Sequence, residues 1–127
     1  MRGLTNALAM LFRLGWLVNI VLGILFWTGT LLQLVPLHML VGLVVAVLLL
    51  ILSILAAVRG AILLAVAGVI VAIAMPIVGV SQDGWLTGSD HWVIQVVHVL
   101  IAVLAIAIAE SARGRIAGRR AAPTRTG

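Results

Sequence analysis

Long apolar segments make up most of the chain, and only short polar segments interrupt them. Four of these segments reach the length of about 20 residues that a helix needs to cross the hydrocarbon core of a bilayer. They span residues 14–32, 36–58, 61–80 and 91–109. The first is too long for a signal peptide and no small-residue cleavage site follows it, so we expect it to be retained. The pattern predicts four membrane-spanning helices.

The breaks between these segments are short, which limits how the helices can be arranged. About four residues near 33–36 join the first two, Arg59-Gly60 joins the next two, and residues 81–90 form the longest connection. Connections this short make sequential helices antiparallel neighbours. We therefore expect an all-α protein, an integral membrane up-and-down four-helix bundle.

Composition agrees with a membrane protein and excludes several classes of function. Hydrophobic residues make up 65% of the chain and charged residues 9%, whereas soluble domains are about 25% charged. The absence of cysteine excludes disulfides, thiolate metal sites and thiol chemistry. No Walker motif, nucleotide fingerprint or catalytic triad is recognisable. The sequence therefore carries no motif that indicates an enzyme activity.

The distribution of charge predicts the orientation in the membrane. Arg2, Arg13, Arg59 and the C-terminal arginines fall on one side of the expected bundle, and Asp83 and Asp90 fall on the other. Because cytoplasmic segments carry an excess of arginine and lysine, we predict a multi-pass protein of the inner (plasma) membrane with both termini cytoplasmic. The net charge of +5 then reflects orientation and attraction to anionic lipid, rather than binding of nucleic acid.

The sequence supports three further predictions about the domain bounds and the cytoplasmic surface. Residues 1–113 should form the transmembrane domain, and 114–127, rich in Arg, Ala, Gly and Thr, should form a disordered tail. Glu110 and Arg113 are three residues apart and should form a surface ion pair. Trp16 is expected in the aromatic belt at this surface.

Small and polar residues mark the helix faces that should turn inward, because membrane helices pack through such residues. In the last predicted helix they recur at alternating steps of four and three, which places them on one face. They are His91, Gln95, His98, Ala102, Ala105 and Ala109. Asn19 and Gly42 belong to similar stripes on the first two helices. We expect these faces to form the bundle interior.

Three histidines are the candidate functional residues, since polar side chains within membrane spans are costly and often functional. His38 lies near the start of the second predicted helix, His91 begins the fourth, and His98 follows two turns later on the same face. His38 opens HMLVGLVVA and His98 opens HVLIAVLAI, so Gly42 and Ala102 each stand four residues after a histidine. This similarity indicates a weak internal repeat that pairs the first two helices with the last two.

The second and fourth helices of such a bundle run in the same direction on a diagonal of about 12–14 Å. This arrangement suits two imidazoles that approach a flat ligand from opposite faces, with a small residue below each. The four spans and the two histidine motifs resemble the small four-helix membrane b-type cytochromes. The resemblance implies a haem b with His38 and His98 as axial ligands, used in electron transfer with a quinone or an extracytoplasmic redox partner. No C-x-x-C-H motif is present, so covalent haem attachment is excluded.

The sequence leaves alternatives open. His91 lies 22 residues before Arg113, close to the 21 that separate His38 from Arg59, whereas His98 lies only 15 before Arg113. Depth therefore favours His91 as the partner of His38. The three histidines could instead converge on copper or zinc.

Purely structural roles for the histidines, and two functions without a cofactor, also remain open. His38 and His91 could be interfacial residues, and His98 could form a purely structural hydrogen bond to Asn19 or Gln95. The chain could equally be a small accessory subunit, or a transport subunit that requires an oligomer, because four spans alone make a thin wall.

Overall fold

The computed structural model describes residues 2–118, and within this range it is all-helical, with no strand. Four long α-helices follow one another along the chain, and each is long and apolar enough to cross a membrane. They are α1 (Arg2–Trp27), α2 (Val35–Val58), α3 (Ile62–Ser81) and α4 (His91–Ile116). Short 3₁₀ helices, η1 (Leu32–Leu34) and η2 (Gln82–Gly84), lie in the two longer connections. The predicted all-α, four-helix architecture is confirmed.

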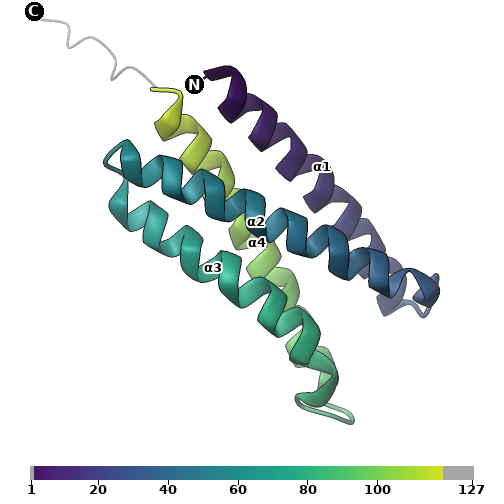
Figure 1. Ribbon diagram of the computed structural model, residues 1–127. Helices are drawn as coiled ribbons and strands as arrows, with labels where there is room; N and C mark the ends of the chain where they lie inside the picture. The colour runs from purple at the N-terminus through teal and green to yellow at the C-terminus, as the bar shows by residue number, and fades with distance from the viewer. Residues whose placement is uncertain (1, 119–127) are drawn as a thin grey trace, which may run out of the picture.

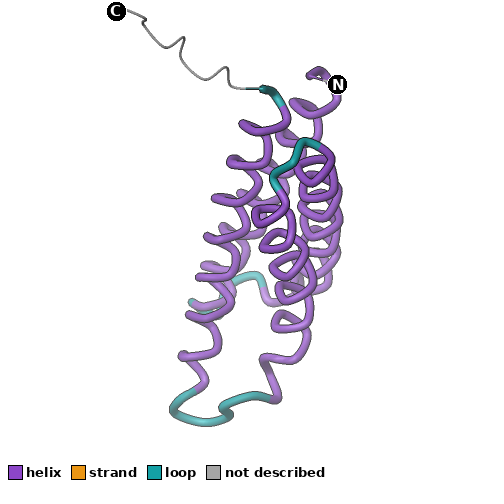
Figure 2. Tube along the Cα trace, turned by 90° about the vertical axis from the view of Figure 1, so that its left-hand side faces the viewer, coloured by secondary structure: helices purple, strands orange, loops and turns teal. Residues whose placement is uncertain are grey.

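The helices run up and down, and sequential neighbours pack against each other (Figures 1 and 2). The first turn of α1, the α2–α3 turn and the end of α4 lie at one end of the bundle, which we call the terminal end. The other two connections lie at the opposite, loop end (Figure 1). The helix α4 contacts α1 and also contacts α2 across the bundle. This direct contact differs from the open diagonal of about 12–14 Å expected for a square arrangement.

Three boundaries differ from the sequence prediction, one of them because α1 ends at Trp27 instead of residue 32. Helix α1 begins at Arg2 instead of residue 14, because Thr5, Ala9 and Phe12 give its first turns a buried face. Helix α4 continues to Ile116, so residues 114–116 of the expected disordered tail are helical. Ala112 and Ile116 are buried, and this apolar face explains the extension. The part of the expected tail at 119–127 lies outside the described residues.

The packed core lies towards the terminal end. Phe12, Leu49 and Leu52 are fully buried there, and Ala105 and Ala112 of α4 pack with them. Beyond the level of Val45 and Met75, towards the loops, the only buried residues of the described chain are Leu22 and Ile94. In this half the α1–α2 and α3–α4 hairpins diverge (Figure 1).

The closest approach of two helices in the core joins α2 to α3. A Cβ atom on Gly68 would collide with the hydroxyl of Ser53. That hydroxyl is buried and donates a hydrogen bond of 2.7 Å to the carbonyl of Leu49 in its own helix. The absence of a side chain at Gly68 therefore lets α3 lie directly against a polar group of α2 that is already satisfied.

Candidate functional site

His38 of α2 and His98 of α4 lie next to each other just beyond the packed core, where the two hairpins begin to diverge. Their ring centroids are 6.4 Å apart and their planes are inclined by 58°. Both side chains are partly buried. The fold therefore brings together the two histidines that the internal repeat indicated. The distance between their rings is short because α2 packs directly on α4.

His91 does not join this pair. Its Nδ1 atom lies 3.4 Å from the carbonyl oxygen of Trp85 in the connection between α3 and α4. The depth count favoured His91, but the fold places His98 beside His38 and His91 at the connection. Within residues 2–118, no three histidine, aspartate or glutamate side chains gather as a metal site would require. The three-histidine arrangement is therefore not formed.

Three buried polar atoms at the histidine pair lack a hydrogen-bond partner. The Nδ1 atoms of His38 and His98 are both buried and have no hydrogen-bond partner, and the same holds for Oδ1 of Asn19. The structural hydrogen bond from His98 to Asn19 or Gln95 is thus not formed. Buried polar atoms without a partner are rare in native proteins. The three atoms belong to residues that lie close together, and none of them has a partner within residues 2–118.

Each histidine faces a glycine of the preceding helix. A Cβ atom on Gly23 of α1 would lie 3.7 Å from Cε1 of His38, and one on Gly79 of α3 would lie 3.2 Å from Cε1 of His98. The two hairpins therefore repeat the same glycine–histidine contact, which supports the internal repeat. Sequence analysis missed both glycines as site residues, because their spacing of 56 residues differs from the 60 that separates the histidines.

The side of the pair nearer the core is closed by α1, which differs from the expected space below each histidine. Asn19 lies against Gly42, where an added Cβ would be 2.9 Å from its Nδ2 atom. The indole N–H of Trp16 donates a hydrogen bond of 2.7 Å to the carbonyl of Ala102. Trp16 packs partly buried against the core.

The ring of Phe26 completes the surroundings of His38. The two rings meet edge to face, with centroids 5.3 Å apart and planes inclined by 73°. This geometry is one that aromatic pairs prefer, and it restricts rotation of the imidazole. Phe26 therefore holds His38 from the loop side, while Gly23 leaves the ring enough room.

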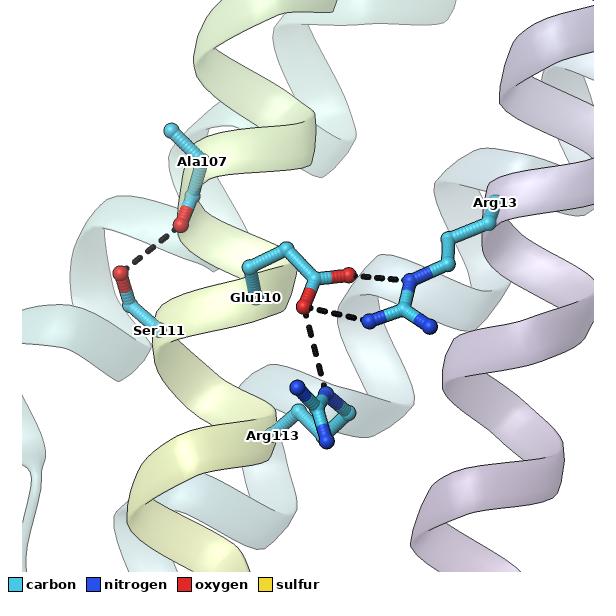
Figure 3. A network of polar contacts seen from close by, with 5 residues as sticks. All are labelled: Arg13, Ala107, Glu110, Ser111 and Arg113. Atoms are coloured by element: carbon cyan, nitrogen blue, oxygen red, sulfur yellow. Dashed lines mark hydrogen bonds and ion pairs between the residues drawn. The ribbon is translucent and has the colours of Figure 1, made fainter.

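A second polar cluster lies near the terminal end (Figure 3). The Arg13 guanidinium donates two hydrogen bonds to Glu110, from Nε to Oε1 at 2.6 Å and from Nη2 to Oε2 at 2.7 Å. Arg113 adds a bond of 3.2 Å to the same carboxylate. The predicted Glu110–Arg113 ion pair is confirmed. Its stronger, two-pronged partner on α1 was not foreseen, because only the packing of α1 on α4 brings Arg13 there.

No protein-family model, curated protein or solved structure matches this chain. Two facing imidazoles with free nitrogens can ligate a metal or share a proton. The apolar helices around the pair favour a ligand that is itself largely apolar.

Proposed function

We propose that the chain is an integral membrane protein that holds one b-type haem between His38 and His98 and takes part in electron transfer. The separation of the two rings is the observation that carries the proposal. Two imidazoles bound on opposite sides of one metal ion through bonds of about 2.0 Å have ring centroids about 6–6.5 Å apart. The centroids of His38 and His98 lie 6.4 Å apart.

The number of protein ligands favours haem over a bare metal ion. Zinc sites use three or four protein ligands, and within residues 2–118 no group of three is present. A porphyrin supplies four of the six positions around iron, so two histidines are sufficient. A copper or zinc site on His38 and His98 alone would be incomplete, which makes it the weaker candidate.

Two features of the surroundings support such a group, although α1 closes the side nearer the core. Gly23 and Gly79 keep side chains away from the outer edges of the two imidazoles, and the Nδ1 atoms of both rings have no hydrogen-bond partner. When bound, haem supplies reversible one-electron chemistry. His38 and His98 would hold it, Phe26 would restrict rotation of the His38 ring from the loop side, and Trp16 and Asn19 would close the core side.

The location of the pair suggests which partners it would serve. His38 and His98 lie in the half of the bundle near the loops, and Arg59, Arg113 and Arg115 lie at the terminal end. With the terminal end in the cytoplasm, the site would exchange electrons with a quinone in the bilayer or with a redox partner outside. The four apolar helices provide the membrane insertion that this role needs.

The visible spectrum of the full-length protein, expressed with adequate haem and purified in detergent, tests this proposal. We expect the Soret and split α/β bands of a six-coordinate low-spin haem on reduction. His38→Ala and His98→Ala should each abolish the low-spin spectrum. His91→Ala is the matched control and should retain it, because His91 lies at the loop.

Three outcomes would contradict the proposal or its assignment of the ligands. A colourless protein with stoichiometric copper or zinc would replace haem by a metal ion. A colourless and metal-free protein would leave a packing or transport subunit. A low-spin spectrum lost in the His91→Ala protein instead of the His98→Ala protein would refute the assignment of the ligands.

A further inference from the structure

A basic cleft opens at the terminal end, far from the histidines. It has a volume of about 1230 Å³ and lies between the α2–α3 turn and the last turns of α4. Arg59 lines it from the turn, and Arg113 and Arg115 line it from α4. The first residues of α3, Ile62–Leu64, form its apolar wall.

The positive charge of this cleft is only partly compensated. Glu110 also lines the cleft, but it already accepts two hydrogen bonds from Arg13 and one from Arg113. Among residues 2–118, Arg59 and Arg115 form no ion pair. The two remaining carboxylates of this range lie in the connection at the loop end and cannot neutralise them. The cleft therefore attracts an anion.

An apolar groove adjoins the cleft on the surface of α2 and α3. It has a volume of about 320 Å³ and is lined by Ile54 and Ala57 of α2 and by Val66, Val69 and Ile70 of α3. Ser53 is its one polar residue, and its hydroxyl is bonded within α2. Ile62 lines both the groove and the basic cleft, so the two are neighbours. A ligand that fits both has a charged head and an apolar chain.

We propose that the basic cleft binds the headgroup phosphate of an anionic phospholipid, with one acyl chain in the groove between α2 and α3. Guanidinium groups form strong charge-assisted hydrogen bonds with phosphate. Basic pockets between helices on the cytoplasmic side of a membrane are suited to anionic headgroups. The exposed apolar side chain of Leu63 at the rim, 88% accessible, would contact lipid. This inference rests on membrane insertion but not on haem, so a failed haem test leaves it intact.

Lipid binding to the full-length protein in detergent provides the test. The protein is titrated with dioleoyl phosphatidylglycerol and, separately, with dioleoyl phosphatidylcholine, and native mass spectrometry measures the retained lipid. We expect preferential retention of phosphatidylglycerol. Arg59→Gln and Arg115→Gln should each weaken it about fivefold, the effect expected for one basic residue near an anionic lipid. Arg2→Gln removes one charge on α1, outside the cleft, and should leave retention unchanged.

A second pair of variants tests the acyl chain. Val69→Phe narrows the groove and should weaken phosphatidylglycerol retention, whereas Ile73→Phe, one turn away and outside the groove lining, should not. Equal retention of the two lipids, or equal loss in the Arg2→Gln protein, would overturn the proposal. Complete displacement of lipid by millimolar inorganic phosphate would also overturn it, in favour of a free-anion site. Full retention by the Val69→Phe protein would refute the placement of the chain.

Discussion

The glycines that face the histidines allow one substitution to be compared at two equivalent places. In Gly79→Ala the new Cβ atom would lie 3.2 Å from Cε1 of His98, which is closer than an ordinary van der Waals contact, so the ring must move. In Gly23→Ala the corresponding distance to His38 is 3.7 Å, an ordinary contact. Alanine in a helix interior gains about 0.5–1 kcal/mol over glycine, whereas overpacking costs about 1–3 kcal/mol.

We therefore expect Gly23→Ala to raise the free energy of unfolding by about 0.5–1 kcal/mol and Gly79→Ala to lower it by up to about 2 kcal/mol. Denaturation in mixed micelles, followed by circular dichroism, measures both. The imidazole resonances of His98 should shift in Gly79→Ala, while those of His38 change little in Gly23→Ala. Equal free energies for the two variants, or a less stable Gly23→Ala protein, would refute the packing of the two rings on these glycines.

Three further predictions concern the core and the topology. Trp16→Phe should cost about 0.5–1.5 kcal/mol in unfolding free energy, because it removes the hydrogen bond to an α4 carbonyl. Trp27→Phe, at an exposed site without such a bond, should cost less. Equal losses in the two variants would contradict a stabilising role for the Trp16 hydrogen bond. Phe12→Ala should cost about 3–5 kcal/mol, since the ring is fully buried, and a loss below about 1 kcal/mol would show that the start of α1 is not packed. Cysteines placed singly at Gly3 and Thr87, in a chain that has none of its own, should react with a membrane-impermeant reagent from opposite sides, and labelling of both from one side would refute the topology.

The helices themselves could be predicted because each is a local property of the sequence. A long apolar segment without charge has few alternatives to a helix in an apolar solvent. Errors occurred where amphipathic ends extend the helices, at Arg2 and at Ile116. Packing between helices determines the length of these ends, since Phe12 and Ala112 become buried only when the helices pack together.

The histidine pair could be predicted in part. Matching segments after His38 and His98 indicated two equivalent positions, and the fold places these rings side by side. Counting residues from the arginines led to His91 instead, because a linear count ignores where each helix ends and how it is tilted. Trp16 likewise reads as a belt residue in sequence, yet its N–H is satisfied inside the bundle.

The sequence by itself determined that four apolar helices follow one another with short connections, that arginines gather at one end, and that two similar hairpins each carry a histidine. These properties depend on residues close together in the chain. Only the tertiary structure decided that α2 contacts α4, that His98 meets His38, and that Arg13 reaches Glu110. Those contacts depend on the rotation and tilt of whole helices, which side-chain packing between distant segments fixes and no local pattern encodes.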